Sequence, residues 1–156
     1  MNADIEELYQ EVILDHSRRP RNVGEIVAGA VHVRGDNPSC GDEIDLHIKF
    51  GTDGGIEDVK FTGQGCAISQ ASASLMTLKV KGRGRADAET MLKAFHDLVT
   101  TEVADPPKML GDLRLLQGVR KFPQRVKCAM LAWRALEQAM AARDGEGRVS
   151  TEGAVE

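Results

Sequence analysis

The chain has 156 residues, a length typical of one domain that buries roughly 70% of the surface its unfolded form would expose. With 42% hydrophobic and 28% charged residues, it has the composition of an ordinary globular protein. Its net charge of -4 argues against broad binding to nucleic acid or to anionic membranes, so any partner contact is expected to be local.

The first residues do not resemble a secretory signal, because Asp4, Glu6 and Glu7 lie there and no apolar run follows. No apolar stretch approaches the ~20 residues of a membrane-spanning helix. These features predict a cytoplasmic protein with no membrane association. In a reducing compartment, three cysteines indicate free thiols or metal thiolates rather than disulfides.

An opening helix is predicted to end near His16. Asp4 followed by Glu7 resembles a capping box. A basic loop over residues 17–24 follows, because the residue before a proline disfavours helical backbone and Gly24 ends the segment. The apolar stripe of the helix consists of Ile5, Leu8, Tyr9, Val12 and Ile13.

Residues 43–50 alternate strictly between polar and apolar side chains, the pattern of an antiparallel strand with one buried face. A glycine-rich turn leads to a second strand at 56–61, and an earlier strand is indicated near residues 31–33. Because two antiparallel strands of similar length return the chain to its starting level, Cys40 and Cys66 are expected at the same end of the hairpin. The apolar face of the first hairpin strand consists of Ile44, Leu46, Ile48 and Phe50.

The second half of the chain is predicted to be helical. Small residues without breakers indicate a closely packed helix over 67–81, and Asp87 is a plausible cap for the next. A short helix is expected over 110–119, and Pro123 suits the first turn of a long final helix. The buried face of the helix near Asp87 consists of Met91, Leu92, Phe95, Leu98 and Val99.

The three cysteines, Cys40, Cys66 and Cys128, suggest one metal or sulfur site assembled from distant segments. Cys40 and Cys66 follow loops rich in glycine or proline, and Cys66 and Cys128 lie near helix starts, where the helix dipole favours thiolate. With Asp42 they supply the four sulfur and oxygen ligands that zinc prefers. Their spacing alone is not that of a zinc knuckle.

Simpler interpretations of these residues stay open. Each cysteine can be a small buried hydrophobic residue, and Asp42 can be a turn residue. Lys127 either stabilises the neighbouring Cys128 thiolate or lays its stem along a helix. The histidines are interpreted as solvated or locally bonded rather than as ligands: His16, His32, His47 and His96.

Three motifs occur in the order seen in a known family. The chain resembles the SufU branch of the IscU/NifU-like iron-sulfur cluster assembly proteins over most of residues 5–140. The resemblance rests on Asn37-Pro38-Ser39-Cys40-Gly41-Asp42, on Gly63-Gln64-Gly65-Cys66-Ala67 and on Phe122-Pro123-Gln124-Arg125-Val126-Lys127-Cys128.

The resemblance implies an α+β fold with a small, mainly antiparallel three-stranded sheet packed on one face by helices. Residues 1–144 would form this domain. Residues 145–156, which lack apolar periodicity, are predicted to be a disordered tail.

The resemblance also implies a zinc ion bound by Cys40, Asp42, Cys66 and Cys128. It implies a zinc-dependent sulfurtransferase-like carrier that accepts persulfide sulfur from a SufS-type cysteine desulfurase and delivers it to downstream iron-sulfur assembly proteins. Lys127 stands where scaffolds of the family usually have histidine, and residues 82–117 match an extra segment typical of SufU. Both features point away from a pure cluster scaffold.

Cys40 is the hypothesised sulfur acceptor, because its loop contains the flexible Gly41. Two alternatives remain, a scaffold for a transient [2Fe-2S] cluster and a non-catalytic, zinc-stabilised activator of the desulfurase. The residues considered for partner contact are basic: Arg18, Arg19, Arg21 and Arg125.

Overall fold

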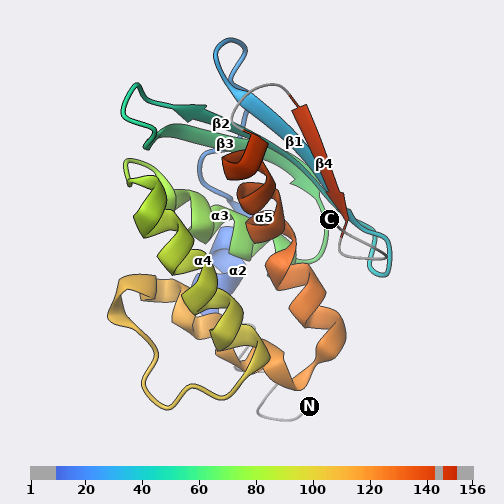
Figure 1. The fold of residues 1–156 in the computed structure, drawn as a ribbon. Helices are drawn as coiled ribbons and strands as arrows, with labels where there is room; N and C mark the ends of the chain where they lie inside the picture. Colours follow the sequence, from blue (N-terminus) through green and yellow to red (C-terminus); the bar gives the residue numbers. More distant parts are fainter. Residues whose placement is uncertain (1–9, 143–145, 151–156) are drawn as a thin grey trace.

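The computed structural model describes residues 10–142 and the short strand Glu146–Ser150, and it consists of one sheet with helices packed on one face (Figure 1). The antiparallel strands β1 (Val31–Asn37), β2 (Asp42–Phe50) and β3 (Ile56–Gln64) form most of the sheet. The predicted α+β class, with three antiparallel strands covered on one face, is confirmed.

The register of these strands keeps one face apolar. Leu46 in the central strand pairs with Val33 of β1 and with Phe61 of β3, and all three side chains are buried. Ile48 is also buried, whereas Phe50, at the end of the alternating run, is only partly buried. A slip by one residue would turn this apolar set towards solvent, so the alternation in the sequence fixes the pairing.

A fourth strand, β4 (Glu146–Ser150), pairs in parallel with β1 and gives the sheet order β3-β2-β1-β4. These five residues lie in the predicted disordered tail, so that prediction is wrong for them. They contain a single apolar residue, Val149, so no alternation marks them, and the pairing uses backbone groups along the outer edge of β1. The rest of the predicted tail lies outside the described residues, and the domain boundary after 144 stays a prediction.

The helices follow the predicted order, with shifted ends. α2 (Glu11–Arg18) ends two residues beyond His16, and its predicted first turn lies outside the described residues. α4 begins with Gly84 at its N-cap, so the prediction that Asp87 caps it is wrong. The full bounds are α3 (Ala67–Val80), α4 (Arg85–Thr100), the 3-10 segment η1 (Lys108–Lys121) and α5 (Pro123–Ala142).

η1 is irregular because Gly111 interrupts it with φ 55° and ψ -130°, a left-handed conformation that glycine adopts at little steric cost. In the described part of the chain, no helix is long and apolar enough to cross a membrane.

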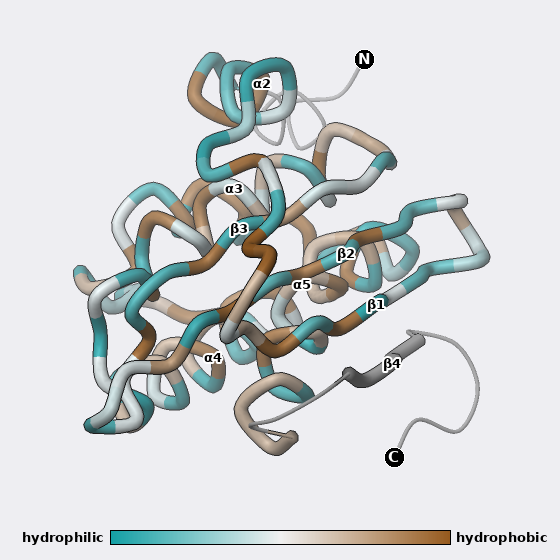
Figure 2. The backbone as a smooth tube through the Cα atoms, turned by 90° about the horizontal axis from the view of Figure 1, so that it is seen from above, coloured by the Kyte–Doolittle hydropathy of each residue, from teal (hydrophilic) through white to brown (hydrophobic). Residues whose placement is uncertain are grey.

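α3 lies at the centre of the helical layer and packs against α2, α5, η1 and β3. Its small side chains permit this close approach, and Ser72 donates a hydrogen bond of 2.7 Å to the carbonyl of Ala129 in α5. Trp133 of α5 donates to Ser72 at 3.2 Å and stacks on Phe95 of α4, with ring centroids 4.9 Å apart. These contacts with α3 and α4 set the position of α5. Seen from above, α2 lies beyond the β3 side of the sheet (Figure 2).

Replacing Leu46 by alanine should destabilise the fold by about 2 to 5 kcal/mol, because it removes a fully buried side chain from the central strand. The matched control is Leu78→Ala on α3, where the leucine is 50% exposed and the expected change is within about 0.5 kcal/mol. Urea unfolding of both variants measures the difference, and equal losses would contradict the assigned core.

Candidate metal centre

The four predicted ligand residues come from four places in the fold that meet at one end of the hairpin. Cys40 lies in the turn between β1 and β2, and Asp42 is the first residue of β2. Cys66 is the N-cap of α3, directly after β3, and Cys128 lies in the second turn of α5. Because β2 and β3 are antiparallel, Cys40, just before β2, and Cys66, just after β3, lie at the same end of the hairpin, as predicted.

The side chains of Cys40, Asp42 and Cys128 offer ligand atoms that all lie within 4.8 Å of one another, a group that can hold a metal ion. Cys66 stands beside this group. Its backbone N–H donates to Asp42 Oδ1 at 2.8 Å, and its sulfur is hydrogen-bonded to the Cys128 thiol. The structure therefore brings all four residues together, and all three cysteines are free thiols.

Exposure differs sharply among these residues. Asp42 and Cys128 are 0% exposed, Cys66 is intermediate and Cys40 is exposed. The interpretation of Asp42 as an ordinary turn residue fails, because a solvated turn carboxylate would not be fully buried with several donors around it. The cluster therefore has one accessible thiol, that of Cys40, and a buried part that consists of Asp42 and Cys128.

Several donors fix the Asp42 carboxylate. Besides the Cys66 N–H, the side-chain amide of Asn37 donates to Oδ2 at 3.0 Å, and the Ser69 hydroxyl lies 3.3 Å from Oδ1. Gly65 packs so closely here that an added Cβ would overlap Asp42 and Ser69, which explains the glycine before Cys66. The sequence analysis missed the roles of Asn37 and Ser69, although both lie inside or beside the quoted motifs.

The pKa values of the two inner thiols are shifted in opposite directions by the hydrogen bond between them. The hydrogen bond from Cys128 lowers the pKa of Cys66 to about 6, and backbone N–H groups of Ser69 and Ile68 at the start of α3 act in the same direction against burial and the Asp42 charge. The same hydrogen bond and burial raise the pKa of Cys128 above its ordinary range. Of the two thiols, Cys66 is therefore the more acidic.

Each histidine has a partner away from the cysteines, which agrees with the prediction that none is a ligand, although His16 and His47 are buried rather than solvated. The ring of His16 is hydrogen-bonded to Ser74 at 2.7 Å, and the rings of His32 and His47 bond the backbone of Ile26. His96 lies 3.8 Å from the carboxylate of the neighbouring Asp97.

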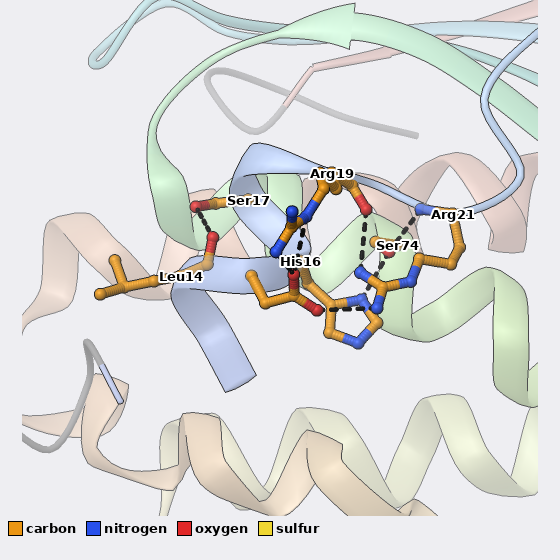
Figure 3. Close-up of polar contacts among 7 residues, drawn as sticks. Leu14, His16, Ser17, Arg19, Arg21 and Ser74 are labelled. Atoms are coloured by element: carbon orange, nitrogen blue, oxygen red, sulfur yellow. Dashed lines mark hydrogen bonds and ion pairs between the residues drawn. The ribbon is translucent and has the colours of Figure 1, made fainter. Parts of the chain in front are cut away.

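Two of the candidate contact residues in the basic loop, Arg19 and Arg21, are held by ion pairs. Arg19 and Arg21 both bind the carboxylate of Asp15, at 2.9 and 2.7 Å (Figure 3). These bonds hold the pKa of Asp15 below its usual value. The Arg21 backbone N–H also donates to Ser74 of α3, while Arg18 is exposed. The suggested role of these arginines and of Arg125 in partner contact stays a prediction.

A small α+β domain with thiols and one buried carboxylate gathered at the end of a β-hairpin defines a class of metal-binding protein. The chain belongs to the NifU-like N-terminal domain family, whose pattern matches residues 8–129. The match includes Cys40, Asp42, Cys66 and Cys128.

Individual relatives cover almost the whole chain. It is 47% identical over 145 residues to the zinc-dependent sulfurtransferase SufU of Bacillus subtilis, covering 92% of this chain and 97% of that protein. It is 44% identical over 138 residues to the iron-sulfur cluster assembly scaffold protein IscU of Streptococcus pyogenes, covering 88% and 86%. The crystal structure of the N-terminal part of a nitrogen-fixing NifU-like protein from Brucella abortus has a TM-score of 0.82 at 19% identity, covering 89% and 96%, and shows the same fold.

In the metal-free protein, alkylation of Cys66 should follow a titration with its midpoint near pH 6, because Cys128 stabilises the thiolate by hydrogen bonding. Iodoacetamide labelling across pH, resolved for each cysteine by peptide mass spectrometry, measures this. Cys128→Ala removes the donor and should move the midpoint upwards, towards the ordinary thiol value of about 8.5. A midpoint near 8.5 in the unaltered chain would contradict this effect of the hydrogen bond.

Proposed function

We propose that the chain binds Zn²⁺ through Cys40, Asp42, Cys66 and Cys128 and carries persulfide sulfur from a SufS-type cysteine desulfurase to iron-sulfur cluster assembly. The observation that supports this most directly is the exposure of Cys40 above the buried Asp42 and Cys128. A carrier needs one thiol that a partner can reach and other metal ligands that stay in place.

The donor set fits zinc. Two sulfurs and one carboxylate oxygen, from Cys40, Cys128 and Asp42, lie close enough to share an ion, and Cys66 beside them would complete the tetrahedral coordination that zinc adopts in proteins. The carboxylate is already oriented by its own hydrogen bonds. When bound, zinc would keep its thiol ligands deprotonated near neutral pH. The name of the Bacillus subtilis relative supports zinc in this family branch.

Transfer of sulfur is a thiolate exchange. The Cys40 thiolate attacks the terminal sulfur of a cysteine persulfide on the desulfurase. A bond forms between Cys40 Sγ and that sulfur, the sulfur–sulfur bond of the desulfurase persulfide breaks, and the desulfurase cysteine leaves as a thiolate. The exchange needs no external oxidant or reductant.

Cys40 must be free of the metal to react, because coordination masks a thiolate. Its position suits this requirement. Its loop is closed by N–H groups of Cys40 and Gly41 that donate to the Asn37 carbonyl, and Gly41 adopts φ 75°. Asp42, Cys66 and Cys128 would keep the ion in place.

A transient [2Fe-2S] scaffold is the second candidate. Three thiols and a carboxylate also suit iron, and the Streptococcus pyogenes relative is named a scaffold protein. Lys127 weighs against it, because this lysine stands where scaffolds of the family usually have a histidine. Anaerobic reconstitution with iron and sulfide, followed by visible absorbance, separates the two. A third option, desulfurase activation without sulfur transfer, predicts stimulation with no persulfide on this chain.

Removal of zinc should lower the melting temperature markedly, because structural zinc contributes on the order of 10 kcal/mol in zinc-dependent domains. Asp42→Ala should lose zinc at a lower chelator concentration than the unaltered chain. Asp45→Ala is the matched control, since Asp45 lies on the same strand but pairs with Arg34 on the solvent side. Zinc content and thermal melting after chelator challenge measure both, and identical curves for the two variants would contradict the ligand set.

Incubation with a SufS-type desulfurase and cysteine should place a persulfide on Cys40, seen as a mass increase of one sulfur atom on its peptide. Cys40→Ala should abolish this label and the stimulation of desulfurase turnover. Stimulation without any label on the unaltered chain would favour a non-catalytic activator. A label on Cys66 with Cys40 unmodified would overturn the assignment of the acceptor.

A further inference from the structure

Asn37, the last residue of β1, lies beneath the cluster and is 0% exposed. Its amide nitrogen donates to Asp42 Oδ2 at 3.0 Å and lies 3.5 Å from Cys128 Sγ. The orientation of the amide follows from its partner, because an ionised carboxylate only accepts hydrogen bonds and the nitrogen must face it. One side chain thus bridges a carboxylate on β2 and a sulfur on α5.

The main chain of the same residue shapes the loop of the exposed thiol. The Asn37 carbonyl accepts hydrogen bonds from the N–H groups of Cys40 at 3.2 Å and Gly41 at 2.9 Å. Asn37 also pairs with Asp42 at the end of the β1–β2 ladder. Asn37 therefore contacts, through its side chain or backbone, Cys40, Asp42 and Cys128.

The two oxygens of the Asp42 carboxylate are not equivalent. Oδ1 accepts the Cys66 N–H and is enclosed by Gly65 and the Ser69 hydroxyl. Oδ2 accepts from Asn37, and the Cys128 thiol is also hydrogen-bonded to this carboxylate, so a cation that displaces the thiol proton gains a lone pair there. Asn37 donates to the oxygen best placed to bind metal.

We propose that Asn37 is a positioning residue that sets the metal affinity of the site and moderates the charge on the Cys128 sulfur. The proposal rests on the proposed metal binding by this cluster. Three thiolates and a carboxylate around Zn²⁺ leave a net charge of about -2. An N–H donor near one sulfur and another on the carboxylate disperse that charge without using a coordination position.

Cobalt(II) is the probe, because its bound thiolates give a charge-transfer band that reports on the electron density of the sulfurs. Metal-free full-length protein is titrated with Co²⁺, and affinity is measured against a competing chelator. Asn37→Ala and Asn37→Asp should each weaken Co²⁺ and Zn²⁺ binding by about 10- to 100-fold, the usual effect of losing an outer partner of a ligand. The band should shift to longer wavelength, because the sulfur has lost its hydrogen-bond donor.

Asn22→Ala is the control for general destabilisation. Asn22 also donates a side-chain hydrogen bond, to Thr77 at 2.9 Å, but it lies in the basic loop against α3 rather than in the cluster. This variant should melt at a lower temperature and keep the metal affinity and spectrum of the unaltered chain.

Should the single variants at 37 lose their native circular dichroism, Asn37→Ser decides, because it leaves all four proposed ligands unchanged. It keeps a short polar side chain and the backbone carbonyl of position 37, so folding should be retained, while the amide that contacts both Asp42 Oδ2 and Cys128 Sγ is gone and the band should remain shifted. Unchanged affinity and spectrum in the folded variants would overturn the role of Asn37 alone. Absence of thiolate-to-cobalt absorbance in the unaltered chain would instead refute the proposed function.

Discussion

The hydrogen bond from the Cys66 N–H to the Asp42 carboxylate is the contact on which the site depends. It joins the start of β2 to the start of α3, and it forms because the antiparallel register pairs Glu43 with Gln64 at this end of the hairpin. A buried carboxylate needs such donors, since an ionised group without partners is strongly disfavoured in the interior. The register of the hairpin therefore also determines how Asp42 and Cys66 meet in the cluster.

The third thiol, that of Cys128, is positioned by helix packing rather than by the register of the hairpin. Cys128 belongs to α5, and the position of that helix follows from core packing, through the bond of Ser72 to the Ala129 carbonyl and the stacking of Trp133 on Phe95. Ala129 is the residue next to Cys128 in the chain. A change in the packing of α3 against α5 therefore moves a ligand, so the small residues of α3 serve the site as well as the core.

Much of this arrangement could be predicted from sequence, and the limits have physical causes. The alternation from Glu43 to Phe50 specifies the strand and its buried face, because burial on one side needs a period of two. Cys128 was grouped with the other cysteines because of its residue type and its place near a helix start, and the family resemblance supported that grouping, since its distance in sequence from Cys40 and Cys66 gives no local signal. β4 and the N-cap Gly84 escaped prediction, because edge pairing through the backbone and a cap without a side-chain bond leave no side-chain pattern. The contacts of Asn37 with the cluster were not predicted, because its partners come from β2 and α5.

The buried and exposed parts of the cluster differ in how many contacts hold them in place. Asp42 and Cys128 are enclosed, and burial together with the hydrogen bond to Cys66 raises the pKa of the Cys128 thiol. Cys40 lies outside this enclosure, on a turn whose hydrogen bonds end at a single carbonyl. Displacing Cys40 therefore breaks few backbone contacts, whereas displacing Asp42 would leave the Cys66 N–H without its acceptor and break the bond from Asn37 to Oδ2. Under the proposed function, the loosely held Cys40 is the thiol that would exchange between a metal and a partner without unfolding the rest.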